Sequence, residues 1–206
     1  MRGLYLIAQP PPEKSFSAWL TQVEQALLGG ACLLQYREKN IDASLRLERA
    51  YALQLLCEKY HVPFIVNDCV TTAKQLGVGV HLGQTDNSIA EARKQLGPEA
   101  IIGATCHNSL ELAQQACEQG ASYLAFGRFF PSSTKPDAQP ATLNILTEAK
   151  QKFKLPIVAI GGITLHHAPK LIAAGADLLA VARGVFGEEN PRETCQAFQK
   201  LFREQT

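Results

Sequence analysis

The sequence predicts a (β/α)₈ barrel, in which eight parallel strands alternate with helices. Eight short β-rich runs alternate with helical stretches along the chain, in units of about 25 residues that suit a small barrel. Polar residues also gather where many of these runs end. A doubly wound open sheet shows a similar alternation and is the alternative. The count of eight and the polar strand ends favour the barrel.

The eight strand candidates are mostly continuous apolar runs. They comprise residues 4–8, 32–37, 63–68, 79–83, 101–105, 123–127, 156–162 and 178–184. A strand that is buried on both faces shows such a run, whereas a half-exposed strand alternates apolar and polar residues. The runs therefore indicate a parallel sheet that is covered by helices.

Amphipathic stretches with apolar residues at helical spacing separate the strand candidates. Their apolar positions are Phe16, Leu20, Val23 and Leu27, then Leu45, Ala52, Leu55 and Leu56, then Leu110, Ala113 and Cys117, and finally Leu143, Leu146 and Ala149. Glycine adopts the left-handed conformation that ends many helices, and Gly30, Gly97, Gly120 and Gly175 stand at the expected ends. Ser88 and Glu91 have the spacing of a capping box at a helix start.

Length and composition predict one domain over residues 1–206. The chain has 46% hydrophobic residues and a net charge of +1, with no visible linker or second domain. A near-neutral charge argues against a nucleic-acid partner, and no apolar run approaches the ~20 residues that cross a bilayer. The first residues do not resemble a signal peptide. Six scattered cysteines without a CxxC pair indicate reduced thiols and a cytoplasmic protein.

Cationic residues follow the second strand candidate, at the barrel end where active sites lie. Gln35, Arg37 and Lys39 share one face of an extended chain. Two cations at the mouth of a barrel predict an anionic substrate, because phosphate oxygens are held best by charge-assisted hydrogen bonds. Solvated surface charge is the simpler alternative for either residue alone.

Two aspartates follow the third and fourth strand candidates. Asp68 comes directly after Asn67, and Asp86 lies in the segment after the fourth run. Carboxylates from neighbouring strand ends, close to cations, fit a Mg²⁺ ion that bridges phosphate oxygens. The alternative is a pair of helix N-caps, where aspartate is common.

Two later segments are candidates for phosphate binding. The loop after the sixth strand carries the hydroxyls of Ser132, Ser133 and Thr134 together with Lys135, although serine and proline are also ordinary turn residues. The seventh and eighth strands end in Gly161 and Gly162 and in Ala182, Arg183 and Gly184. Glycine loops after the last two strands of a barrel recurrently bind phosphate through backbone N–H groups.

Two histidines lie close to strand ends. His107 follows the fifth strand and is either a general base at the barrel mouth or a residue that begins a helix. His81 lies inside an apolar run, so a hydrogen-bonded position in or near the core is expected for it.

Nearly the whole chain resembles the thiamine-phosphate synthase family. The resemblance rests on QYREK, FIVND, GVHLGQTD, IIGAT, YLAFGRFFPSSTK and PIVAIGGIT, which follow one another in this order. It implies a (β/α)₈ barrel that joins hydroxymethylpyrimidine diphosphate to thiazole phosphate with Mg²⁺, releasing pyrophosphate and forming thiamine phosphate.

The resemblance also implies roles for individual residues. Those implied to hold the pyrimidine diphosphate are Gln35, Arg37, Lys39, Asn67, Thr105 and Lys135. Asp68 and Asp86 would bind Mg²⁺. Those implied to hold the thiazole phosphate are Ser132, Ser133, Thr134, Gly162, Ala182 and Arg183. Arg37, Lys39 and Lys135 would stabilise the charge on the departing pyrophosphate. No protein nucleophile is then required.

The chain departs from the family pattern at three places. The segment 76–81 is one residue shorter than usual, and Ala182–Arg183 replaces a Val–Ser pair. The first strand begins almost at Met1, which is similar to versions of this domain that follow a Nudix hydrolase. A homo-oligomer is compatible with the sequence, which does not determine the oligomeric state.

Two other functions are compatible with the sequence. A thiazole tautomerase of the same fold would use His107 as its base, since the segment around His107 is similar to the corresponding tautomerase segment. A barrel that binds thiamine precursors without turnover is the third function, supported by the shortened segment and by Arg183. The QYREK, NDC and STK segments favour the synthase, because they provide a diphosphate and metal site that a tautomerase does not need.

Overall fold

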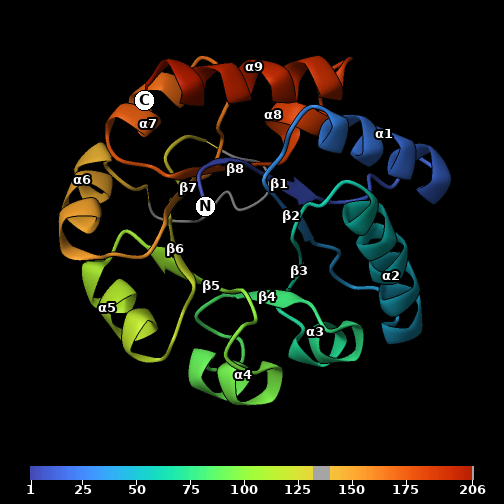
Figure 1. Ribbon diagram of the computed structural model, residues 1–206, viewed down its shortest axis with the longest axis horizontal. Helices are drawn as coiled ribbons and strands as arrows, with labels where there is room; N and C mark the ends of the chain where they lie inside the picture. The colour runs from blue at the N-terminus through green and yellow to red at the C-terminus, as the bar shows by residue number, and fades with distance from the viewer. Residues whose placement is uncertain (132–139, 206) are drawn as a thin grey trace.

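Eight parallel strands close into a barrel, in which β1 pairs with β2 and also with β8. The computed structural model describes residues 1–131 and 140–205. Every strand pairs with its neighbours in the sequence, and the helices form a ring outside the strands (Figure 1). The predicted barrel is confirmed, and the open sheet is excluded because β1 and β8 pair from Gly3 with Leu178 to Leu6 with Val181.

The elements alternate as the sequence predicts. The strands are β1 Gly3–Ala8, β2 Leu33–Tyr36, β3 Phe64–Asn67, β4 Gly79–Leu82, β5 Ile102–His107, β6 Tyr123–Phe126, β7 Ile157–Ile160 and β8 Leu178–Val181. The helices are α1 Phe16–Leu28, α2 Ala43–Lys59, α3 Val70–Leu76, α4 Ile89–Leu96, α5 Leu110–Glu118, α6 Leu143–Lys152, α7 Ala168–Ala173, α8 Arg183–Phe186 and α9 Pro191–Glu204. In the described chain the last unit holds two helices, the short α8 followed by α9, whereas the sequence predicts one.

Each strand is buried on both faces, which explains its continuous apolar run. One face contacts the surrounding helices, as Leu4 and Leu6 of β1 do. The other face fills the barrel, where Tyr5 and Ile7 of β1 pack with Tyr123 and residues of other strands. Successive residues therefore point alternately outward and inward.

Two predicted helix faces, those of α2 and α6, differ from the observed ones at three leucines. Leu45, Leu55 and Leu143 are exposed, with 37%, 48% and 38% of their surface accessible. In α2 the buried residues include Ala50 and Leu53 instead. The buried face of α2 therefore runs through Ala50, Leu53 and Cys57, whereas Leu45 and Leu55 lie on its solvent side.

The predicted helix boundaries are confirmed at most ends. Ser88 begins α4 by accepting a hydrogen bond from the Glu91 N–H at 3.2 Å. Gly97, Gly120 and Gly175 follow their helices with φ of 86°, 89° and 108°, which is the left-handed region that favours glycine.

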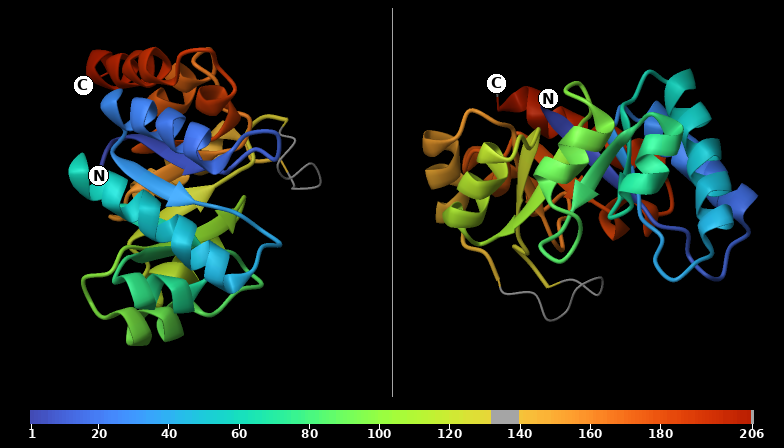
Figure 2. Two further views of the ribbon diagram at one scale, coloured as in Figure 1. Left: turned by 90° about the vertical axis from the view of Figure 1, so that its right-hand side faces the viewer. Right: turned by 90° about the horizontal axis from the view of Figure 1, so that it is seen from below.

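The two ends of the described chain lie on the same side of the barrel (Figure 2). The Arg2 guanidinium donates a hydrogen bond to the Phe202 carbonyl at 3.0 Å and so joins the start of the chain to α9. All six cysteines are free thiols. Among the described residues, no helix combines the length and the apolar character that crossing a membrane requires.

Candidate active site

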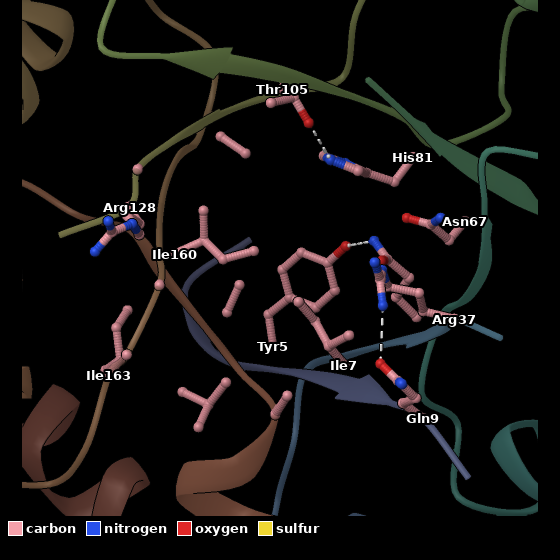
Figure 3. A pocket seen from close by; sticks show the side chains of 18 of the residues that line it. Tyr5, Ile7, Gln9, Arg37, Asn67, His81, Thr105, Arg128, Ile160 and Ile163 are labelled. Carbon is pink, nitrogen blue, oxygen red and sulfur yellow. Dashed lines mark hydrogen bonds between the residues drawn. The ribbon is translucent and has the colours of Figure 1, made fainter. Parts of the chain in front are cut away.

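A cavity of about 600 Å³ opens at the carboxyl ends of the strands. All strands are parallel, so all eight end at this mouth and each contributes to the lining. Figure 3 shows the side chains of Arg37, Asn67, His81 and Thr105 around the cavity, above Tyr5. The fold thus gathers residues from the whole length of the chain at one place.

Polar side chains occupy the inward positions at the strand ends. Gln35, Asn67, His81 and Thr105 come from four consecutive strands, and all four line the cavity. Deeper in the barrel the inward positions are apolar or aromatic, as at Leu33 and Tyr5. The alternation of each strand therefore produces a polar mouth above a packed interior.

The structure brings together every predicted site residue that it describes. Those that line the cavity are Gln35, Arg37, Lys39, Asn67, Asp68, Asp86, Thr105, His107, Gly161, Gly162, Ala182 and Arg183. The predicted residues Ser132, Ser133, Thr134 and Lys135 lie outside the described residues.

Arg37 and Lys39 are held by neighbouring polar groups. Arg37 donates from Nη1 to Gln9 Oε1 at 2.8 Å, and the two side chains face each other in Figure 3. Burial lowers the pKa of the Arg37 guanidinium, while Asp68 acts in the opposite direction. Lys39 Nζ lies 3.1 Å from Asp68 Oδ2. Both cations are therefore fixed beside a carboxylate at one side of the mouth.

Asp68 and Asp86 interact directly. Burial acts to raise the pKa of Asp68, but a hydrogen bond with Asp86 and the Lys39 ammonium outweigh it and lower that pKa. Burial and the Asp68 carboxylate raise the pKa of Asp86, against a hydrogen bond from the Gly83 N–H. Each carboxyl group therefore shifts the pKa of the other, because the two lie close together.

Neither aspartate is a helix N-cap. The residue that precedes α3 as its cap is Cys69, and the one that precedes α4 is Ser88. Asp86 Oδ2 instead accepts a hydrogen bond from Gly83 N–H at 2.7 Å within its own turn. The capping alternative is therefore wrong for both residues.

The aspartate pair fits a divalent cation in part. No group of three or more metal-ligating side chains occurs among residues 1–131 and 140–205. Mg²⁺, however, is commonly bound by one or two carboxylates together with waters and substrate phosphates. A pair of neighbouring carboxylates, beside cations that attract phosphate, matches that donor set.

The turn after β7 lies tightly against the segment after β6. Gly161 and Gly162 have φ of 106° and 62°. A Cβ atom at Gly161 would overlap Arg128, and one at Gly162 would overlap the Pro131 carbonyl. Both positions therefore require glycine, and the close contact brings the backbone of the turn to the cavity wall.

The two histidines occupy different environments. His107 ends β5 with φ of 51° and lines the cavity, while Ser109 is the residue that caps α5. His107 therefore lies at the mouth, as a general base there would, and it does not begin α5. His81 is 8% exposed and is hydrogen-bonded to Tyr123 and Thr105, as expected for a position near the core.

Several lining residues were not predicted from the sequence. They are Tyr5, Ile7, Gln9, His81, Gln84, Arg128 and Glu188, among others. The inward parity of β1 would have identified Tyr5 and Ile7 once the strand was placed. Gln9 continues the same parity just beyond β1. Gln84 has no such signal, because its contact is with the Thr105 carbonyl of another strand.

A family model and a solved structure relate this chain to the same family. The family model of thiamine monophosphate synthase matches residues 4–185. The structure of thiamine phosphate pyrophosphorylase from Pyrococcus furiosus is 34% identical with a TM-score of 0.87, and the match covers 98% of this chain and 96% of that one.

Two more distant structures share the fold alone. GGGPS from Thermoplasma volcanium is 15% identical with a TM-score of 0.73, over 98% of this chain and 93% of that one. (S)-3-O-geranylgeranylglyceryl phosphate synthase from Thermoplasma acidophilum, in complex with sn-glycerol-1-phosphate, is 16% identical with a TM-score of 0.72, over 98% and 94%.

Proposed function

The chain belongs to the thiamine monophosphate synthase family, a family of transferases, and on this premise we propose the reaction that it catalyses. It joins hydroxymethylpyrimidine diphosphate to thiazole phosphate, forming thiamine phosphate and releasing pyrophosphate. The observation that carries the proposal is the mouth of the cavity, where Arg37 and Lys39 lie beside the Asp68–Asp86 pair. This arrangement suits a diphosphate that leaves with a divalent cation.

The pyrimidine diphosphate occupies the side of the cavity that is formed by β2 to β5. Gln35, Asn67 and Thr105 provide neutral polar groups there. Arg37 and Lys39 provide positive charge at the rim, and Lys135 adds to it within the proposal. The neutral groups orient the ring, and the cations bind the phosphates.

The thiazole phosphate occupies the opposite side, above β7 and β8. The Gly161–Gly162 turn offers backbone N–H groups, and Ala182 and Arg183 line the same part of the cavity. Ser132, Ser133 and Thr134 complete this subsite within the proposal. Arg183 takes the position of a hydroxyl in the family pattern, and its guanidinium provides a charge-assisted contact to phosphate.

Asp68 and Asp86 would hold Mg²⁺, which supplies charge stabilisation for the departing pyrophosphate. Arg37 and Lys39 hold the same leaving group, so the C–O bond of the pyrimidine breaks with its electrons going to pyrophosphate. The thiazole nitrogen then attacks the resulting pyrimidine cation. Its phosphate anchors the thiazole, so positioning contributes much of the acceleration.

No protein nucleophile is needed for this substitution. In the part of the chain that the structure describes, no cysteine lines the cavity. The proposal further treats residues 1–206 as one catalytic domain. It places the protein in the cytoplasm, in keeping with its six free thiols.

The proposal is tested by mixing the folded protein with both substrates and Mg²⁺ and measuring pyrophosphate. We expect release that requires all three components. Folded protein that releases no pyrophosphate above background contradicts the proposal. A matched sample with thiazole phosphate omitted separates synthesis from simple hydrolysis.

The second candidate is a thiazole tautomerase, because His107 lines the cavity. A tautomerase moves a proton and requires a base instead of a metal pair. His107→Ala should therefore abolish a tautomerase and spare the synthase, whereas Asp68→Ala should do the reverse. Ligand binding without either reaction would identify a non-catalytic protein.

A further inference from the structure

A chain of hydrogen bonds crosses the floor of the cavity beneath the proposed pyrimidine subsite. Gln35 Nε2 donates to the Tyr5 hydroxyl. The Tyr5 and Tyr123 hydroxyl oxygens are 2.8 Å apart, and Tyr123 is 2.8 Å from His81 Nδ1. His81 Nε2 lies 2.9 Å from Thr105 Oγ1. The first and last side chains both line the cavity, so these hydrogen bonds join two sides of the mouth through the barrel interior. Figure 3 shows the last of them, between His81 and Thr105.

The three inner members are buried and tightly fitted. Tyr5 is 1% exposed, Tyr123 is fully buried, and His81 is 8% exposed. The His81 ring stacks on Tyr123 with their planes 12° apart, and the two tyrosine rings meet edge to face. Position 103 must be glycine, because a Cβ there would overlap the Tyr123 hydroxyl. Burial also raises the pKa of both tyrosines, so each keeps its single proton.

The Gln35 amide nitrogen, which can only donate, sets the direction of every hydrogen bond in this series. Tyr5 accepts from the Gln35 amide, so its own proton is donated to Tyr123. Tyr123 in turn donates to His81 Nδ1, and in a neutral His81 ring this places the proton on Nε2. His81 then donates to Thr105, whose hydroxyl proton remains for a partner in the cavity.

The opposite end of the chain has the complementary polarity. Because the Gln35 nitrogen faces Tyr5, the carbonyl oxygen Oε1 is left as an acceptor. No protein partner for this oxygen occurs among the described residues. If the Gln35 amide were reversed, the donor and acceptor of every hydrogen bond in the series would be exchanged. Gln35 would then offer a donor to the cavity and Thr105 an acceptor.

We propose that Tyr5, Tyr123 and His81 are positioning residues that set this polarity and so select the ligand. With Gln35 as acceptor and Thr105 as donor, the floor favours a heteroaromatic ring that presents an exocyclic amino group to Gln35. It disfavours the oxo analogue, which places a carbonyl oxygen against the Gln35 oxygen. The inference rests on the proposed function, since it concerns the pyrimidine of that reaction.

The first test compares amino-substituted hydroxymethylpyrimidine diphosphate with its oxo analogue. We expect the wild-type protein to favour the amino compound by at least about a hundredfold in kcat/KM. Tyr123→Phe should reduce this preference by at least about tenfold, because Tyr5 can then donate to a reversed Gln35 amide. Tyr36→Phe is the matched control, since it removes the hydroxyl of a buried tyrosine that donates to Glu38 and takes no part in this series of hydrogen bonds. An unchanged preference in folded Tyr123→Phe contradicts the proposal.

The second test determines the direction of these hydrogen bonds without measuring enzyme turnover. Nitrogen NMR of the ¹⁵N-labelled protein should show His81 protonated on Nε2. Tyr5→Phe should produce a mixture of tautomers although Tyr5 does not touch His81, and Tyr36→Phe should not. A wild-type His81 protonated on Nδ1, or an unchanged tautomer in folded Tyr5→Phe, overturns the proposal. A protein that makes no thiamine phosphate would instead fail the proposed function, and this measurement would still decide the polarity.

Discussion

Asp68 and Asp86 are the two aspartates that line the cavity in the described chain. We expect Asp68→Asn and Asp86→Asn each to lower kcat/KM by at least about a hundredfold, because the proposed Mg²⁺ site then loses one of its two carboxylates. Pyrophosphate release measured across a Mg²⁺ titration checks this expectation. Calorimetry of Mg²⁺ binding in the presence of pyrophosphate gives a readout that does not depend on turnover.

Asp42 provides the matched control for this experiment. It follows β2 and begins α2 by accepting a hydrogen bond from the Ser44 N–H at 2.7 Å, but it does not line the cavity. Asparagine also caps helices well, so Asp42→Asn should retain full activity. If the variants at positions 68 and 86 keep the Mg²⁺ dependence of the wild type, the aspartates do not form the metal site.

The buried thiols predict how stability depends on pH. Burial raises the pKa of the Cys57, Cys106 and Cys195 thiols from 9.0 to about 12. The folded state therefore holds these protons more tightly than the unfolded state. Their contribution to stability is complete below pH 9 and is lost as the pH rises to about 12. Urea unfolding should show a free energy of unfolding that falls over this range.

Thiol labelling provides an independent check near neutral pH. Burial acts to raise the pKa of Cys69, but hydrogen bonds with Thr72 and the nearby Arg46 outweigh it and lower that pKa. Cys69 should therefore react first in the folded protein, and Cys69→Ser should remove the fast phase. Equal reaction rates for all six thiols without unfolding would show that burial does not protect them.

The sequence predicts the charged site residues better than the neutral ones. Arg37 and Asp68 directly follow β2 and β3, and Asp86 lies in the turn after β4, so their position at the mouth is evident once the strands are placed. Tyr5 and Tyr123 are 118 residues apart in the sequence, and their hydrogen bond exists only because β1 and β6 face each other inside the barrel. Such a contact across the barrel requires the three-dimensional structure.

At the scale of secondary structure, β5 depends on a glycine that faces a neighbouring strand. A Cβ at position 103 would overlap the Tyr123 ring. We expect Gly103→Ala to lower the free energy of unfolding by about 3 kcal/mol, because neither the strand nor the buried ring can move freely. Chemical unfolding measures this loss.

Gly77 is the control for that substitution. It has φ of 67°, but no atom lies within 4 Å of a Cβ there. Gly77→Ala should therefore cost about 1 kcal/mol from backbone strain alone. Equal losses for the two variants would mean that contact with Tyr123 is not the cause.

Arg93 of α4 joins its helix to two loops that precede strands. Its guanidinium donates to the carbonyls of Ala100 at 2.7 Å and Gly120 at 2.7 Å, and to the Ser122 hydroxyl at 3.1 Å. We expect Arg93→Lys to lower the free energy of unfolding by about 2 kcal/mol, because an ammonium group cannot reach all these acceptors. Thermal unfolding checks this.

Arg192→Lys is the control for Arg93, because Arg192 is an exposed residue of α9. It should leave the free energy of unfolding within about 0.5 kcal/mol of the wild type. A similar loss in both variants would contradict the structural role of Arg93.

Strands are predicted from the sequence more accurately than helix faces. Every predicted strand is present, since burial on both faces requires a continuous apolar run. The face of α2 was wrong at Leu45 and Leu55, because this helix packs through small residues such as Ala50. Hydrophobic spacing alone does not distinguish a leucine at the barrel from one in solvent.

At the scale of the whole molecule, closure of the barrel concentrates charge at one end. The net charge is +1, yet Arg37, Lys39, Arg128 and Arg183 all line the same cavity. The sequence predicts this for Arg37, Lys39 and Arg183, because a parallel barrel places all strand ends together, but it does not predict Arg128. It does not predict the extra short helix α8, because the eighth unit shows only one amphipathic stretch.

The stoichiometry of products tests the central claim most directly. A fixed, limiting amount of pyrimidine diphosphate is mixed with excess thiazole phosphate, Mg²⁺ and the folded protein, and both products are quantified at completion. The proposed reaction predicts equal amounts of pyrophosphate and thiamine phosphate, with neither formed when Mg²⁺ or thiazole phosphate is left out. Pyrophosphate without thiamine phosphate, or no product at all, would contradict it.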